Sequence, residues 1–170
     1  MRDYWFLIES QFSPPQFEAL NFLVKAAARS GLNLYLTGGA VRDLVSGHPV
    51  RDLDFAVEGN PRKILLHVKK TELAIIHFDK LRQCADVTFS NGVCVEIGMC
   101  RTELYKCPGG LPKVRSAAIT DDLRRRDFSI NSMAVSLNLN SRGLFLDPNN
   151  GVADLERKEL RALYNQSFCD

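Results

Sequence analysis

The sequence predicts a mixed α/β fold in which the helices lie mainly on one face of the sheet. Two patterns support this prediction. Apolar residues recur at helical spacing within residues 14–30, and several later short segments alternate in the way that β-strands do. The composition is that of a globular protein, since 45% of the 170 residues are hydrophobic and 25% are charged. We expect one domain over residues 13–170, preceded by an N-terminal extension over residues 1–12.

The first elements flank a pair of glycines. Residues 14–30 predict a helix with one apolar face, and residues 33–37 predict a short strand. Gly38 and Gly39 interrupt that strand, and a short helix is expected from about residue 40 to residue 46. The order is therefore helix, strand, glycine turn and helix.

The rest of the chain continues this alternation. The further strands are expected at 52–57, 73–78, 84–89 and 93–99, and the last two are joined by an Asn91-Gly92 turn. The further helices are expected at about 61–70 with Asn60 as its cap, 119–126, 128–134 and from near Val152. Residues 104–118, which include Pro108-Gly109-Gly110, predict a mobile loop. We expect strands 33–37, 52–57 and 93–99 to lie close together in the sheet.

Composition excludes several classes of protein. The chain has neither the bias of a disordered or collagen-like sequence nor an apolar run of the roughly 20 residues that a membrane span needs. Its N-terminus lacks the apolar stretch of a signal peptide. The five cysteines are odd in number, irregularly spaced and without a CxxC pair, which favours reduced thiols in a cytoplasmic protein over a zinc site. No membrane partner is expected, and the sequence does not define an oligomeric state.

The charge distribution points weakly to phosphate. The net charge of the whole chain is only +2, which by itself implies no nucleic-acid partner. Residues 101–126, however, contain seven basic and three acidic side chains. A basic segment of this kind suits a phosphate ligand, although a solvated loop and helix face would have the same composition.

Acidic residues on two predicted strands are candidates for a cation site. Asp52 and Asp54 are separated by one residue, so that a strand would place both carboxylates on one face. Glu96 is flanked by apolar residues on another strand and could be a third acid if the two strands are neighbours. Mg²⁺ is typically held by one or two carboxylates together with substrate phosphates. The alternative is that these acids are solvated at strand ends or on an exposed strand face.

The glycine turn and a later arginine run could supply phosphate ligands. Gly38 and Gly39 allow the backbone to approach a phosphate closely, and Arg42 would lie in the first turn of the following helix. The segment Arg124-Arg125-Arg126-Asp127-Phe128-Ser129-Ile130-Asn131 lies between two predicted helices. Its arginines could reach a triphosphate, and Asp127 and Asn131 could bond a ribose hydroxyl or each other. Alternatively, Asp127 or Ser129 caps the next helix and the arginines are solvated.

Taken together, these segments resemble the catalytic head domain of the class II tRNA nucleotidyltransferase (CCA-adding enzyme) and bacterial poly(A) polymerase family. Four blocks are similar to the family's motifs and come in the family's order. They are Gly38-Gly39-Ala40-Val41-Arg42-Asp43, Arg51-Asp52-Leu53-Asp54-Phe55, Arg125-Arg126-Asp127-Phe128-Ser129-Ile130-Asn131, and Asp147-Pro148 with Gly151, Asp154-Leu155 and Leu160-Arg161. The resemblance covers about residues 32–163 and implies a polymerase-β-like nucleotidyltransferase fold.

The resemblance also implies roles for these residues. Asp52 and Asp54 would hold Mg²⁺, two ions being implied during catalysis, and Glu96 would be the third catalytic acid. Nucleotide binding would fall to the residues of the glycine turn and the arginine block, namely Gly38, Gly39, Arg42, Arg126, Asp127 and Asn131. Family members use ATP or CTP to add nucleotides to an RNA 3′ end, and they release pyrophosphate. The implied partners are therefore ATP or CTP and the 3′ end of a tRNA or another RNA.

The family's EDxxR block, which selects the base, has no counterpart within these 170 residues. The sequence therefore predicts the metal and triphosphate part of a site without its base-selecting neck. Two alternatives remain open. The chain could belong to a nucleotidyltransferase that modifies a small molecule or a protein, or it could be a nucleotide-binding module without catalysis.

Overall fold

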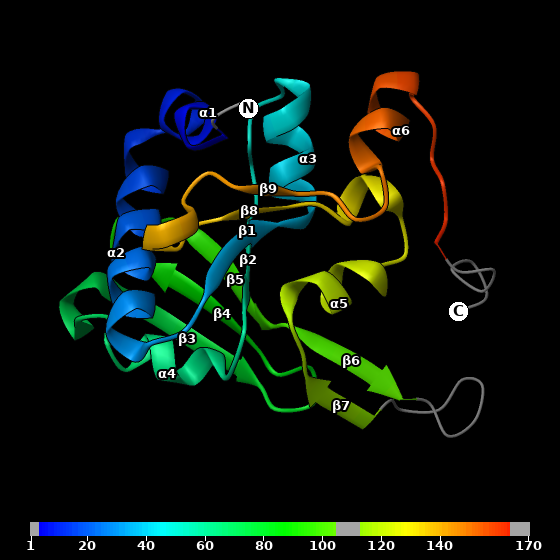
Figure 1. Cartoon of the computed structure of the whole chain (residues 1–170). Helices are drawn as coiled ribbons and strands as arrows, with labels where there is room; N and C mark the ends of the chain where they lie inside the picture. The colour runs from blue at the N-terminus through cyan, green and yellow to red at the C-terminus, as the bar shows by residue number, and fades with distance from the viewer. Residues whose placement is uncertain (1–3, 105–112, 164–170) are drawn as a thin grey trace.

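The computed structural model describes residues 4–104 and 113–163 and contains a mixed sheet of seven strands with a separate two-stranded hairpin (Figure 1). The α-helices are α1 (Tyr4–Gln11), α2 (Pro14–Ser30), α3 (Gly38–Ser46), α4 (Pro61–Leu65), α5 (Ile119–Arg124) and α6 (Gly151–Arg157). Short 3₁₀ turns are formed by Lys70–Glu72, Ser129–Asn131 and Leu139–Ser141. None of the helices in the described part of the chain has the length and apolar character needed to cross a bilayer.

The sheet has the strand order β3-β4-β5-β2-β1-β8-β9. These strands are β1 (Leu34–Thr37), β2 (Leu53–Val57), β3 (Leu73–Asp79), β4 (Cys84–Phe89), β5 (Cys94–Met99), β8 (Ala134–Ser136) and β9 (Phe145–Leu146). Strands β2 and β5 are parallel, and the other neighbouring pairs are antiparallel. The prediction that strands 33–37, 52–57 and 93–99 lie close together is confirmed, because they form β1, β2 and β5 at the centre of the sheet.

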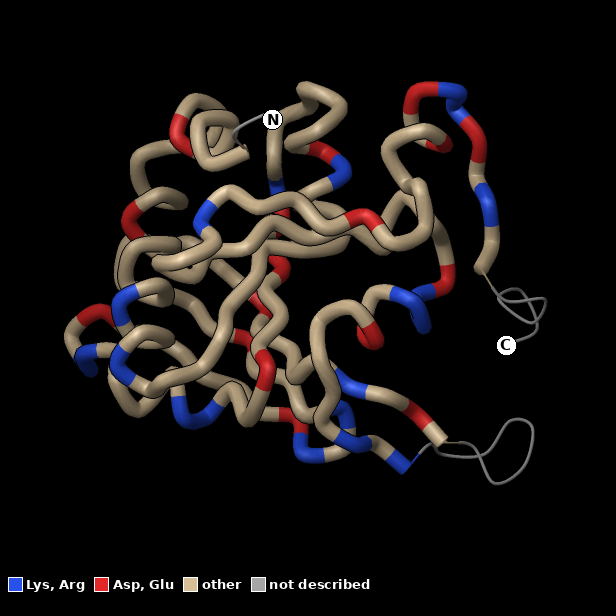
Figure 2. The backbone as a smooth tube through the Cα atoms, viewed as in Figure 1, with Lys and Arg blue, Asp and Glu red and all other residues tan. Residues whose placement is uncertain are grey.

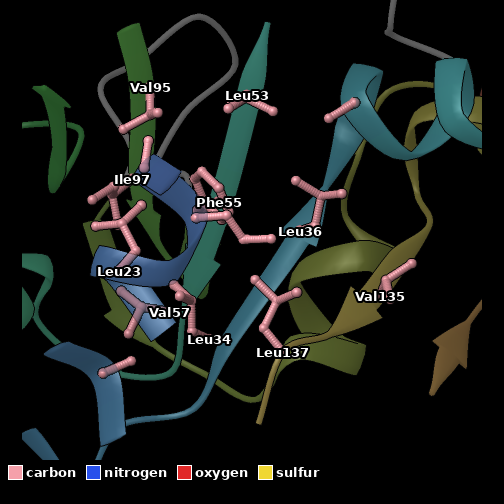
Figure 3. Packing of buried hydrophobic residues seen from close by; sticks show 14 of the residues in the cluster. Leu23, Leu34, Leu36, Leu53, Phe55, Val57, Val95, Ile97, Val135 and Leu137 are labelled. Atoms are coloured by element: carbon pink, nitrogen blue, oxygen red, sulfur yellow. The ribbon is translucent and has the colours of Figure 1, made fainter. Parts of the chain in front are cut away.

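One face of this sheet carries the main core. Inward side chains of β1, β2, β5 and β8 pack with α2 and α3, as Figure 3 shows for Leu23, Leu36, Phe55 and Ile97. The opposite face carries a smaller cluster, in which Ile119 and Leu123 of α5 pack on Tyr35, Ala56, Cys100 and Ala134. The expected arrangement, with helices mainly on one face, is therefore confirmed, and α5 is the helix that covers the other face.

The N-terminal segment packs into the main core. Residues 4–11 form α1, in which Ile8 is fully buried. Tyr4 stacks on Phe145 of β9 with the ring centroids 4.3 Å apart, and Phe12 is 7% exposed. The described part of the segment 1–12 thus contributes to the same hydrophobic core as α2 and α3.

Several predicted boundaries differ from those in the structure. The strand expected from residue 33 begins at Leu34, and helix α3 begins directly at Gly38. Helix α4 ends at Leu65 rather than near residue 70, because its last turn tightens and buries Val68. The helix expected over 119–126 ends at Arg124.

Two predictions were wrong because segments expected as helix or loop pair as strands. The helix expected over 128–134 is a single 3₁₀ turn, because the buried residues that follow it form β8 and pair with β1. Within the loop expected over 104–118, residues Lys113–Ser116 form β7, which pairs with β6 (Arg101–Leu104). The rest of that predicted loop, residues 105–112, lies outside the described residues.

The packing of α1 generates a testable prediction about stability. Substituting Ile8→Ala removes a fully buried side chain, and we expect it to lower the free energy of unfolding by about 2–5 kcal/mol. The matched control is Phe6→Ala on the same helix, because Phe6 is 65% exposed and its loss should change stability by less than about 0.5 kcal/mol. Urea unfolding followed by circular dichroism measures both. Equal stabilities for the two variants would contradict the packing of α1.

Candidate active site

The turn between β1 and α3 brings three distant parts of the chain together. Gly38 has φ +66°, a conformation that glycine adopts far more readily than other residues. A Cβ atom on Gly38 would lie 3.1 Å from Oδ2 of Asp54 and 3.2 Å from Nη1 of Arg126. The backbone of the glycine turn is therefore packed directly against a β2 carboxylate and an arginine from the segment after α5.

Asp54 is the central acid of this site. Its carboxylate accepts a hydrogen bond from the backbone N–H of Gly39. Burial raises the pKa of Asp54 above its ordinary value, and the nearby Asp52 charge adds to that rise, whereas Arg126, Gly39 and Arg42 oppose it. A bound cation would favour the charged carboxylate in the same way as the two arginines.

Glu96 lies beside Asp54 in the sheet. The two residues are register partners in the parallel strands β5 and β2, so that their side chains are on the same face. Burial raises the pKa of Glu96, and the charges of Asp54 and Asp86 raise it further. The structure therefore places two mutually repelling carboxylates side by side, as the sequence predicted if the strands were neighbours.

Asp52 lies next to these acids but outside the strand. Strand β2 begins at Leu53, so the strand expected over 52–57 starts one residue later and Asp52 precedes it. Asp52 is exposed and, together with Arg42, Asp43, His48, Pro49 and Arg51, lines a surface hollow of about 340 Å³. Within residues 4–104 and 113–163, no three His, Cys, Asp or Glu side chains form a group that could hold one metal ion. Asp54 is therefore close to Asp52 and to Glu96, and among the described residues the three acids are not a complete ligand set.

Two arginines border the acids and share one partner. Arg42 of α3 bonds Asp43, and its Nη1 donates to Oδ1 of Asn131 at 3.0 Å. Arg126 donates from Nη1 to the backbone oxygen of Asn131 at 3.3 Å and from Nη2 to Asp122 at 3.1 Å. The Nε atom of Arg126 is buried and has no hydrogen-bond partner among the described residues. Asn131 thus contacts both guanidinium groups near Asp54.

The other residues of the arginine block have different positions. Asp127 is exposed, and its backbone oxygen accepts a hydrogen bond from Leu163 at 2.8 Å. Arg125 contacts the β6–β7 hairpin, where it donates to the backbone oxygen of Arg101 and to Glu103. Figure 2 shows the basic positions at the end of α5 and the acidic positions on the central strands. Sequence reasoning grouped these arginines, but the described contacts bring only Arg126 of this run to the glycine turn.

The fourth sequence block contacts the segment that contains Ser129 and Asn131. Asp147 accepts hydrogen bonds from the backbone N–H groups of Gly151 and Val152 at the start of α6. The buried Asp154 accepts from Ser129 at 2.5 Å and from Arg161 at 2.8 Å. Because Ser129 begins the 3₁₀ turn that contains Asn131, these contacts fix the residue that holds the two site arginines.

Sequence reasoning missed Asp122, which touches this arrangement directly. Its side chain is 2% exposed and forms ion pairs with both Arg125 and Arg126. The available signal was the spacing, because acidic and basic side chains three and four positions apart meet on a helix. That spacing alone does not reveal that the pair is buried.

Comparison with known proteins is decisive at this point. The family model described as "Poly A polymerase head domain" matches residues 34–161, which include every residue of the glycine turn, the acids and the arginine block. The chain belongs to this family.

The relatives of this head domain are tRNA nucleotidyltransferases. The A-adding enzyme of Halalkalibacterium halodurans is 36% identical over 164 residues, covering 96% of this chain and 38% of the relative. The CC-adding enzyme of Deinococcus radiodurans is 34% identical over 159 residues, covering 94% and 42%. The solved apo form II of a CCA-adding enzyme superposes with a TM-score of 0.87 at 30% identity, covering 99% of this chain and 40% of that one. The chain thus spans about two-fifths of the length of these proteins.

The close approach at the glycine turn of this head domain can be tested by substitution. Gly38→Ala would put a Cβ against Asp54 and Arg126, whereas Gly47→Ala would put one into open space at a similar φ of +72°. Both variants carry the strain of a left-handed alanine, which is about 1 kcal/mol. We expect Gly38→Ala to lower the free energy of unfolding by about 1 kcal/mol more than Gly47→Ala does. Denaturant unfolding of both variants measures the difference, and equal losses would refute the contact.

Proposed function

We propose that this chain is the catalytic head of a metal-dependent nucleotidyltransferase that adds CMP or AMP from CTP or ATP to the 3′ end of an RNA, such as a tRNA. One observation carries this proposal. At Gly38, the start of α3 lies against the carboxylate of Asp54, which can bind a metal ion, and the guanidinium of Arg126, which can bind a phosphate. The family membership supports the same reaction class. The free thiols of Cys84, Cys94 and Cys100 suit the cytoplasmic location that we propose for it.

We propose Mg²⁺ as the cofactor, with two ions during transfer. Asp52, Asp54 and Glu96 would hold it, because they offer the hard oxygen donors that Mg²⁺ prefers. When bound, Mg²⁺ would supply charge neutralisation at the phosphates and a lowered pKa at the attacking hydroxyl.

The triphosphate would lie over the start of α3. Gly38 and Gly39 would allow its oxygens to approach the backbone, and Arg42 and Arg126 would supply positive charge. The buried Nε of Arg126 supports this placement, since a donor without a partner is unfavourable until an acceptor such as a phosphate oxygen reaches it.

The sugar would be recognised by the segment that follows Arg126. Asp127 is exposed and would accept a hydrogen bond from a ribose hydroxyl. Asn131 would act mainly on the arginines, because its side-chain oxygen already accepts from Arg42. In the reaction, the 3′ oxygen of the RNA forms a bond to the α-phosphorus, the bond to the β-phosphate oxygen breaks, and pyrophosphate leaves. The hydroxyl proton passes to water.

Replacing the acids tests the metal assignment. We expect Asp52→Asn and Asp54→Asn each to lower primer extension on a tRNA that lacks its 3′ end by at least about 10³-fold, because each variant removes charge that would hold the cation. Isothermal titration of the same variants should show no Mg²⁺-dependent ATP binding. Glu156→Gln is the control, since Glu156 is exposed on α6 and should leave both readouts unchanged. Wild-type turnover in either aspartate variant would contradict the assignment of that residue as a metal ligand.

Nucleotide preference supplies an independent test. The proposed residues would contact phosphate, sugar and cation, and none of them is assigned to a base edge. We therefore expect the 170-residue chain to bind ATP, CTP, GTP and UTP with dissociation constants within about tenfold of one another. Titration of each nucleotide in excess Mg²⁺ measures this, and a strong preference for one base would show that a selecting group lies within these residues.

A further inference from the structure

The buried carboxylate of Asp122 contacts both the β6–β7 hairpin and the arginine beside the glycine turn, which are separated in the sequence. Its Oδ1 atom accepts from the backbone N–H of Arg101 at 3.0 Å and from Nη2 of Arg125 at 2.6 Å. Its Oδ2 atom accepts from Nη2 of Arg126 at 3.1 Å. One carboxylate oxygen therefore binds the start of the β6–β7 hairpin, and the other binds Arg126 beside the glycine turn.

We infer that Asp122 is a positioning residue, which sets the guanidinium of Arg126 against Gly38 and thereby determines the affinity of the site for a nucleoside triphosphate. This inference rests on the proposed function, since it gives Arg126 a phosphate to bind. It assigns to Asp122 no contact with substrate.

The charges around Arg126 explain why a second carboxylate is needed. Arg126 lies between Asp54 and Asp122, and it lowers the pKa of Asp54. Without Asp122, the Asp54 carboxylate would be the strongest remaining attraction for this guanidinium. Arg126 would then move toward Asp54 and occupy the oxygens that the cation requires. Asp122 thus holds the arginine close to the acid without letting the two neutralise each other.

The contacts of the same guanidinium support a held geometry. Nη1 donates to the backbone oxygen of Asn131, and Nη2 donates to Asp122. A guanidinium fixed at both terminal nitrogens has one planar orientation, which suits recognition of a phosphate. Asp121, the neighbour of Asp122 on α5, is exposed and provides a matched control.

A double-mutant cycle on the 170-residue chain tests this role by titration with Mg²⁺–ATP. We expect Asp122→Asn to weaken binding about tenfold and Asp121→Asn to change it less than about twofold. In an Arg126→Ala background, Asp122→Asn should have no further effect, because the residue through which it acts is gone. Wild-type affinity in Asp122→Asn would overturn the inference. So would losses that multiply in the double variant, since Asp122 would then act without Arg126.

A second readout does not depend on nucleotide binding. The side-chain ¹⁵Nε–¹H signal of Arg126 should shift and broaden in Asp122→Asn and stay unchanged in Asp121→Asn. If the wild-type chain fails to bind Mg²⁺–ATP, the proposed function falls, yet this signal still decides whether Asp122 orders Arg126. An unchanged Arg126 signal overturns the inference.

Should Asp122→Asn unfold, Asp122→Glu restores the charge at the same position. In that variant, an Arg126 signal as sharp as in the wild type, with affinity within about threefold, supports the positioning role. A folded Asp122→Glu protein with a broadened Arg126 signal contradicts it.

Discussion

The site depends on the absence of a side chain at Gly38. Since this residue has no Cβ, the start of α3 can lie directly against the Asp54 carboxylate and the Arg126 guanidinium. Sheet topology supplies the acids for this contact. The parallel pairing of β2 with β5 places Glu96 beside Asp54, and the antiparallel pairing of β1 with β2 brings the glycine turn to the same end of the sheet. Repulsion between the carboxylates is then opposed by the two arginines and a backbone N–H.

Each site arginine is held by partners other than Asp54. Arg42 is bound by Asp43 and Asn131, and Arg126 is bound by Asp122 and Asn131. The two guanidinium groups therefore remain near the carboxylates of the site without occupying the oxygen atoms of those carboxylates. Maintaining this separation requires support well beyond the site itself.

That support includes a sequence block whose described hydrogen bonds lie within the protein. The block around Asp147 and Asp154 lies behind the 3₁₀ turn and fixes Ser129. The sequence resemblance placed this block among the functional motifs, and its described contacts are structural. The Ser129–Asn131 turn holds Asn131 in place, and Asn131 in turn helps to orient the guanidinium of Arg126.

The sequence predicted what local patterns control and failed where distant pairing decides. Helix α2 and the glycine turn follow from spacing and from glycine chemistry, so both were found. The helix predicted over 128–134 was wrong at its end, because Ala134 is the first residue of β8 and only its pairing with β1 makes that residue extended. Asp122 was missed for the same reason: its spacing to Arg126 is local, but its burial exists only once α5 packs on the sheet. The types and order of the residues thus identify the groups that would bind a metal ion and phosphates. The residues that orient those groups are identified only from the tertiary fold.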